Sequence, residues 1–350
     1  LTPNLGHCQS ALGIARELSA YFKLPLHAVD MAAKTSSGKT AIFQPYIEDP
    51  KDCPRYSYAV MTNLQPVKTP FWLRLVLEKA GFGSFNPIVD VLNYVMLATG
   101  QPMHAFDYAA IEEPISIKRS LGESIHLLDG ATKKVPAGSI GIYAKDTCLA
   151  IAGIMGSLDS SVTKNTQAVL LEAATFNPQK IRKTMQAVDL RSESALRFEK
   201  GIDPNAAVLA LEMATHLLQK IAGGTCEGPI FTSSPDVSLR SVSLRKSRVN
   251  QILGAALSAA EIDELLTRLG MKITAKDANT SAISIPSFRN DLIAEIDLIE
   301  EIARLYGYDH LPSTPITPIT PVDTPLGSIP TKKLGKIHHD PYFSFTLFLR

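Results

Sequence analysis

The chain has 350 residues, of which 45% are hydrophobic and 20% are charged. This length suggests two or three domains, and the composition is that of an ordinary globular protein. Lys and Arg total 35 against 34 Asp and Glu, giving a net charge of +1, which excludes a protein that binds nucleic acid over its whole surface. Without a signal pattern or an apolar run long enough for a membrane helix, we expect a cytoplasmic protein with no membrane contact.

The four cysteines, Cys8, Cys53, Cys148 and Cys226, lie far apart and form no CxxC pair. This spacing supports neither a structural zinc site nor a disulfide framework. Scattered thiols fit a reducing compartment. The first residue is not Met, and the last twenty form an apolar and basic tail without a closing element. We therefore expect a fragment.

Apolar residues at helical spacing predict a first helix over 8–22, capped by Asn4 or Ser10 and ended by Pro25. Residues 1–29 are thus expected to be the end of an N-terminal subdomain. Alternating polar and β-branched or aromatic residues predict strands within 28–64. Two helices follow, over 70–80 and 87–99, each with a proline near its first turn, where the missing N–H costs nothing.

Short strands at close spacing fill 114–171, which indicates an antiparallel-rich sheet and not an array of strand–helix–strand units. Helical patterns return over 177–187, 194–199 and 203–222. The composition then loosens at 223–229 and again at 233–236, which suggests a domain boundary. We expect the first domain to cover 30–230.

Residues 237–312 are predicted to form a second, smaller domain in the order strand, helix, helix, strand, strand, helix. The Pro/Thr run that follows is an extended connector, so 313–350 are expected to be a linker and a truncated tail. The fold class is α+β: a mixed, largely antiparallel sheet domain followed by a small winged-helix-like α+β domain.

The first candidate site combines Asn93 and His104. The helix over 87–99 runs out at Gly100 and Pro102 stiffens the exit, so a rigid element presents the His104 side chain. Asn93 lies eleven residues earlier, about three helical turns away. A lone histidine is more often structural, so the spacing alone leaves both roles open.

Two further features lie among the strands. Gly153 and Gly156 permit a tight turn or the close approach of a ligand to the backbone. Glu172 ends an apolar run, and a buried carboxylate needs a donor or a ligand hydroxyl, whereas an exposed strand end would need neither. Ser192 and Ser194 precede a short charged helix, either as caps or as lining of a site.

An acidic helix closes the second domain. Its apolar face is predicted to hold Leu292, Ile296, Ile299, Ala303 and Tyr306. Asp297, Glu300 and Glu301 are placed on the opposite face, with Asp291 just before the helix. Converging carboxylates of this kind suit Mg²⁺ better than zinc, although the spacing alone favours a solvated acidic helix face.

Taken together, these blocks resemble the β subunit of bacterial-type phenylalanyl-tRNA synthetase. The matching motifs, in the family's order, are T-P-N…G-I-A-R-E-L, V-D-x-x-N-Y-V-M-L-x-x-G-Q-P-M-H-A-F-D, L-L-E-A-A-x-F, R-F-E-K-G-I-D-P and R-x-D-L…D-L-I-E-E-I-A-R-L-Y-G-Y-D. They cover about residues 1–312.

The resemblance implies a subunit that pairs with an α subunit in an (αβ)₂ ligase. The α subunit would use ATP to attach phenylalanine to tRNA-Phe, while the β subunit would hydrolyse mischarged Tyr-tRNA-Phe. By analogy, Glu172 would accept the tyrosine hydroxyl, and His104 and Asn93 would position the ester or the water. The other matched positions are Gly153 and Gly156 beside the aminoacyl-adenosine, Ser192 and Ser194 in the amino-acid pocket, and Asp291, Asp297, Glu300 and Glu301 for a Mg²⁺ near the α-subunit interface.

Some positions depart from the family pattern. Gly83 stands where members often carry a basic residue, and some members have Thr and Ala in place of Ser192 and Ser194. The family's N-terminal tRNA-binding barrel and its later domains have no counterpart here. The alternative to an editing subunit is a structural one that supports the α chain without editing. An unrelated magnesium hydrolase centred on 291–301 would leave the other motifs unexplained.

Overall fold

The structure is a computed structural model that describes residues 2, 4–27, 42–111, 114–234, 237–277 and 279–313. The predicted connector and tail lie outside the described residues from 314 onward, as do 28–41 of the first predicted strand region. All elements below belong to one compact unit, Leu1–Leu311. No helix among the described residues has the length and hydropathy needed to cross a membrane.

The chain begins with a short 3₁₀ helix, η1 (Gly6–Cys8), and helix α1 (Ala11–Phe22). Of the two predicted caps, Ser10 is the one observed, since its Oγ accepts the backbone N–H of Gly13 at 3.0 Å. The helix ends before Pro25, where Lys23 takes the left-handed conformation with φ of 56°.

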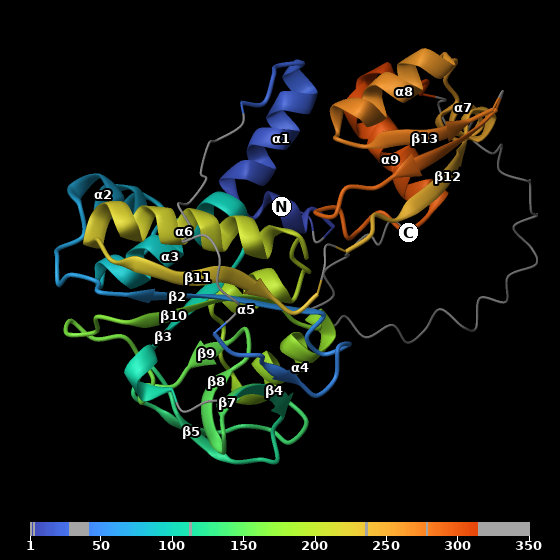
Figure 1. Cartoon of the computed structure of the whole chain (residues 1–350). Coiled ribbons are helices and arrows are strands. Elements are labelled where there is room, and N and C mark those ends of the chain that lie inside the picture. Colours follow the sequence, from blue (N-terminus) through green and yellow to red (C-terminus); the bar gives the residue numbers. More distant parts are fainter. Residues whose placement is uncertain are drawn as a thin grey trace, which may run out of the picture. The chain divides into compact units, whose positions relative to one another are not determined.

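The central sheet is antiparallel, in the strand order β11-β2-β10-β3. Its strands are β2 (Arg55–Thr62), β3 (Met103–Asp107), β10 (Val169–Thr175) and β11 (Thr225–Thr232). Helices α2 (Phe71–Lys79), α3 (Pro87–Thr99) and α6 (Ala206–Ala222) cover one face, as Figure 1 shows. Because β10 is buried on both faces, its sequence is a nearly unbroken apolar run.

A second sheet packs against the other face of the central sheet, in the order β1-β4-β7-β8-β9. Its strands are β1 (Tyr46–Ile47), β4 (Ile115–Arg119), β7 (Ile140–Ala144), β8 (Thr147–Ile151) and β9 (Met155–Gly156). Beside it lie the hairpin β5 (Ser124–His126) with β6 (Thr132–Lys134), 3₁₀ helix η2 (Tyr108–Ala110), and helices α4 (Pro178–Val188) and α5 (Glu193–Phe198). β1 and β4 pair in parallel, so the sheet is mixed, as predicted.

The smaller unit has its own apolar core and the predicted element order. Its elements are β12 (Ser241–Arg245), α7 (Lys246–Leu253), α8 (Ala259–Arg268), β13 (Lys272–Lys276), β14 (Thr280–Ser284), α9 (Glu295–Tyr306) and 3₁₀ helix η3 (Tyr308–His310). The sheet order is β12-β14-β13, antiparallel throughout. The predicted α+β fold class is confirmed.

Two features differ from the sequence predictions. The loosened composition of 223–229 does not mark a loop, because most of these residues belong to β11, an edge strand of the central sheet. Its register with β2 shifts between Glu227 and Phe231, which accommodates Gly228 and Pro229. The apolar face of α9 is only partly as predicted. Leu292, Ile299 and Ala303 are buried, as expected, but Ile296 is 54% exposed. The face also includes Leu298, Ile302 and Leu305, which are buried and were not predicted.

Candidate functional site

A cavity lies where the central sheet faces the second sheet. Five of its lining residues were predicted as site residues: His104, Gly153, Gly156, Glu172 and Ser194. The remainder of the lining is mainly apolar and includes Pro102, Met103, Ile142, Ala150, Ile151, Ile154, Met155, Phe176 and Phe198. Segments far apart in the sequence therefore meet around one polar pair in an apolar pocket.

Strand pairing brings Glu172 and His104 together. β10 and β3 run antiparallel in a register that places Glu172 directly opposite His104. Residues two apart on a strand share a face. Leu170 and Phe106, each two residues from one member of the pair, belong to the core between the two sheets. The alternate residues, such as Leu171, pack toward the helices, so both polar side chains face the second sheet.

The Glu172 side chain is buried without a compensating charge. The residue is 5% exposed, and burial raises the pKa of its carboxyl to about 8. No hydrogen bond from another described residue contributes to that shift. Near neutral pH this carboxyl is therefore mostly protonated, and it can donate as well as accept a hydrogen bond.

Burial has the opposite effect on His104, because it also penalises the charged form of a base. It lowers the pKa of the imidazole to about 4, so the ring is neutral at pH 7. Its Nε2 is buried and has no hydrogen-bond partner among the described residues. The ring also meets Phe106 edge to face, with centroids 4.4 Å apart. His104 is thus held in place by packing while one ring nitrogen remains available.

The two predicted glycines are required by close contacts. A Cβ at Gly156 would lie 2.5 Å from Cε1 and 2.6 Å from Nε2 of His104, closer than real Cβ atoms approach. Gly153 has φ of +69°, and a Cβ there would lie 2.9 Å from the Phe198 ring. Any larger residue at 156 would displace the imidazole.

The remaining predicted residues are divided. Ser194 lines the cavity, with its Oγ 3.9 Å from the sulfur of Met96. Ser192 does not line it; this residue caps α5 by accepting the Ala195 N–H, and it donates to the Ile154 carbonyl at 2.8 Å. Asn93 is half-buried on α3 and is not among the lining residues, so the structure does not bring it to the pair.

The sequence reasoning did not single out Phe176 and Phe198, whose rings pack at a centroid distance of 5.2 Å beside the pair. Both stand inside quoted motifs, Phe176 at the end of L-L-E-A-A-x-F and Phe198 in R-F-E-K. An aromatic residue gives no chemical signal in a sequence, because most such residues simply fill a core.

The four predicted magnesium ligands do not form a preformed site in this chain. Arg289 binds the Asp291 carboxylate and also Glu301, which is 1% exposed and in turn binds Arg304. Burial opposes ionisation of Glu301, but the hydrogen bonds from both arginines outweigh it and lower the pKa of the carboxyl.

The other two carboxylates have different surroundings. Asp297 accepts the backbone N–H groups of Ile293 and Ala294, and Glu300 is exposed. Among the described residues, the group of three potential metal ligands that does converge is His7, Cys8 and Glu17, and it includes none of these four carboxylates. The prediction that acidic side chains converge on one solvated helix face is therefore wrong for Glu301, because two guanidinium groups make its burial possible.

The two shifted pKa values of the pocket predict opposite pH dependences. The pKa of the Glu172 carboxyl is about 8 in the folded chain, against an ordinary 4.5. Between these values the unfolded chain binds fewer protons, so the free energy of unfolding falls as the pH rises. The pKa of His104 is about 4 when folded, against an ordinary 6.5, so its contribution is lost as the pH falls through that window.

In the folded chain, only Glu172 of this pair changes its protonation between pH 6.5 and 8. We expect the stability of the wild-type chain to fall across this window relative to Glu172→Gln, by about 1.4 kcal/mol per pH unit at most. Urea denaturation at constant ionic strength measures the difference. Glu227→Gln, at an exposed position of the same sheet, is the control and should follow the wild type. Parallel curves for wild type and Glu172→Gln would show that the carboxyl titrates normally.

The chain is similar in sequence to two known domain families and to several known proteins. The B3/4 domain family matches residues 52–223, and the tRNA synthetase B5 domain family matches residues 242–308. The phenylalanine–tRNA ligase beta subunit of Protochlamydia amoebophila is 39% identical over 316 residues, which is 89% of this chain and 40% of that protein. The same subunit of Nitrosococcus oceani is 40% identical over 319 residues, covering 90% of this chain and 40% of its own length.

A solved N-terminal fragment of the phenylalanyl-tRNA synthetase beta subunit from Pyrococcus horikoshii also matches. It has a TM-score of 0.44 and 17% identity, and covers 87% of this chain and 85% of that one. The chain spans about 40% of the length of the curated relatives it matches. By its B3/4 domain, the B5 domain that follows it and its identity to these subunits, the chain is identified as a relative of phenylalanine–tRNA ligase β subunits.

Proposed function

We propose that the chain is part of a phenylalanine–tRNA ligase β subunit and that its B3/4 domain removes tyrosine from mischarged tRNA-Phe. A pocket that binds phenylalanine cannot strongly reject tyrosine, which merely adds a hydroxyl, so such a ligase needs a second, hydrolytic site. The observation that carries the proposal is the unpaired, mostly protonated Glu172 carboxyl facing a neutral His104 inside an apolar pocket.

The lining of the pocket supports a preference for tyrosine over phenylalanine. The rings of Phe176 and Phe198 would pack on the amino-acid side chain, and the Glu172 carboxyl would exchange hydrogen bonds with its hydroxyl. A phenylalanyl group would leave that buried carboxyl unpaired, which costs about 1–3 kcal/mol. Discrimination between the two aminoacyl groups by about 10–100-fold follows from this difference.

His104 would act mainly by positioning. With a pKa of about 4, its imidazole is a weak base at neutral pH, but the unpaired Nε2 can accept a hydrogen bond from a water molecule. In the hydrolysis, the water oxygen bonds to the tyrosyl carbonyl carbon. The bond from that carbon to the ribose oxygen breaks, and the ribose oxygen takes up the proton that the water releases. Gly156 leaves room for the imidazole itself, because a Cβ there would meet the ring; the aminoacyl-adenosine would approach the backbone beside it.

The rest of the assembly belongs to the same proposal. An α subunit would supply the site where ATP, phenylalanine and tRNA-Phe react, in an (αβ)₂ enzyme that acts in the cytoplasm. The B5 domain would face that subunit. Net charge +1 indicates that tRNA-Phe is held through other parts of the assembly as well.

Release of labelled tyrosine from Tyr-tRNA-Phe tests the proposal, with the chain alone and with the chain combined with an α subunit. We expect His104→Ala and Glu172→Ala to lower deacylation by about 10–100-fold, the effect expected of a lost 1–3 kcal/mol interaction. Glu172→Ala should in addition reduce the preference for Tyr-tRNA-Phe over Phe-tRNA-Phe. His126→Ala and Glu227→Gln, both away from the cavity lining, are the matched controls. If the wild-type chain, alone and combined with an α subunit, deacylates Tyr-tRNA-Phe no faster than spontaneous hydrolysis, the editing proposal fails. The alternative, a structural subunit that does not edit, would then hold.

A further inference from the structure

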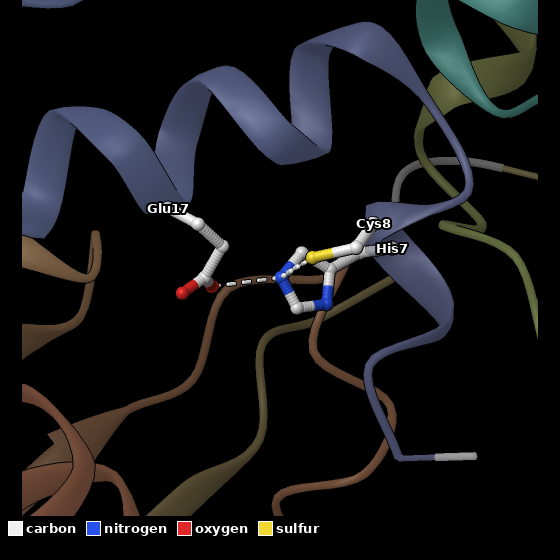
Figure 2. A group of neighbouring side chains, drawn as sticks. All are labelled: His7, Cys8 and Glu17. Carbon is white, nitrogen blue, oxygen red and sulfur yellow. Dashed lines mark hydrogen bonds and ion pairs between the residues drawn. The ribbon is translucent and has the colours of Figure 1, made fainter. Parts of the chain in front are cut away.

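Three metal-ligating side chains converge at the N-terminal end of the chain, away from the pocket of Glu172. Figure 2 shows His7 and Cys8, from η1, pointing toward Glu17 of α1. His7 Nε2 lies 2.9 Å from Glu17 Oε1 and 3.4 Å from Cys8 Sγ. The side chains of His7 and Glu17 are 3% and 18% exposed, and Cys8 is 4% exposed. A nitrogen, a sulfur and an oxygen atom therefore lie close together in a largely buried site.

The local backbone brings these residues together. Gly13 and Glu17 stand one helical turn apart on α1 and so share a face. A Cβ at Gly13 would lie 1.9 Å from the His7 carbonyl oxygen, so only glycine lets η1 lie against the helix there. The Ser10 hydroxyl fastens the contact, because it donates to that carbonyl and accepts the Gly13 N–H, both at 3.0 Å. The η1 segment therefore packs closely against the helical turn that precedes Glu17.

Glu17 is already oriented as a ligand. Its Oε2 binds Arg304 at 2.7 Å, which leaves Oε1 to face His7. Burial works against its charge, but the hydrogen bonds from His7 and Arg304 prevail and lower the pKa of the carboxyl to about 2. Carboxylate ligands in metal sites are commonly held by such a second partner. Arg304 also binds Glu301, so the ligand is tied to the buried ionic network of α9.

We propose that His7, Cys8 and Glu17 bind one zinc ion, with water as the fourth ligand. Mixed N, S and O ligands are typical of tetrahedral zinc, at about 2.0–2.3 Å. The three ligand atoms lie within 4.8 Å of one another, so small side-chain movements close the site. On binding, the Cys8 thiol releases its proton. The imidazole binds through Nε2, so the proton that this nitrogen donates to Glu17 in the metal-free chain leaves it. The ring proton of the bound form is then on Nδ1, which has no other partner among the described residues.

The site would fasten η1 to α1 and does not depend on the hydrolytic activity proposed above. It also changes what the cysteine spacing suggested, because the ligands come from an adjacent His-Cys pair and a glutamate nine residues later, and no CxxC motif is needed. Sequence motifs for zinc identify ligands that recur at a fixed spacing in the sequence. Here one ligand, Glu17, comes from helix α1 and reaches the other two only because η1 packs against that helix.

Titration of the metal-free full chain tests the inference, with zinc by calorimetry and with Co²⁺ by absorption. We expect one ion per chain, a near-ultraviolet thiolate-to-cobalt band and a raised Tm with zinc. Cys8→Ser should remove the band, and Glu17→Gln should weaken zinc binding at least 10-fold. Cys148→Ser and Glu264→Gln, both outside the group, should behave as the wild type.

Circular dichroism of each metal-free variant separates lost binding from lost folding. Arg304→Gln leaves all three ligands in place and should weaken zinc without removing the cobalt band, so it provides a second reading if Glu17→Gln folds poorly. Absence of stoichiometric zinc in the wild type would overturn the site. So would a cobalt band that persists in Cys8→Ser, or zinc uptake unchanged in both Cys8→Ser and Glu17→Gln.

Discussion

Arg289→Met is expected to lower the free energy of unfolding by about 3–5 kcal/mol, the usual cost of leaving a buried charge without its partner. Arg289 is 2% exposed. Its guanidinium donates to Glu301 at 2.5 Å and to both carboxylate oxygens of Asp291, at 2.9 and 2.7 Å. Methionine fills a similar volume but offers no donor. Urea denaturation of the full chain at neutral pH measures the loss.

A double-mutant cycle identifies the cause. In Arg289→Met the Glu301 carboxylate keeps only Arg304. If the cost arises from this incompletely paired carboxylate, Arg289→Met combined with Glu301→Met should recover much of the stability, because two apolar residues can replace a buried pair. Arg248→Met, at an exposed position of α7 in the same unit, should change stability by no more than about 0.5 kcal/mol. A loss of less than about 1 kcal/mol in Arg289→Met would show that the buried pair is not a major contributor.

The ionic network of Arg289, Glu301 and Arg304 also shows what helical periodicity in a sequence cannot predict. The spacing of α9 predicted its existence and extent correctly, because a long amphipathic helix has a strong period. It predicted the burial of Ile299 and Ala303 but not that of Glu301, because helical periodicity assigns every carboxylate to the exposed face. Glu301 becomes a core residue only when Arg289 and Arg304 lie beside it and satisfy both of its oxygens. Such pairing depends on tertiary contacts that the period of one helix does not contain.

The candidate site shows a similar division. Strand β10 was predicted from its apolar run, and Glu172 from the cost of burying a carboxyl within it. The cross-strand partner His104 followed from the family motif; its facing of Glu172 depends on the register of β3, which the sequence does not specify. Strand β11 was missed because its Gly and Pro are typical of a turn, and only its pairing with β2 makes it a strand.

Gly156→Ala is expected to abolish most of the proposed deacylation and to destabilise the chain by about 1–3 kcal/mol, as overpacking does. The reason is geometric: the added methyl group would lie 2.5 Å from the His104 ring, on a strand that has little freedom to move. His104 would have to rotate away from the face it shares with Glu172. Deacylation of Tyr-tRNA-Phe and urea denaturation measure the two effects separately.

The origin of the Gly156 effect can be tested through its partner. In a His104→Ala background the methyl group meets no ring, so Gly156→Ala should then cost little stability, and the two substitutions should be strongly non-additive. Gly83→Ala is the matched control, because a Cβ there would touch only the Phe85 ring at an ordinary 3.5 Å. An undiminished cost in the His104→Ala background would mean that the strand itself, and not the imidazole, requires glycine. A fully active Gly156→Ala variant would remove His104 from the proposed hydrolysis, because the ring cannot keep its position beside that methyl group.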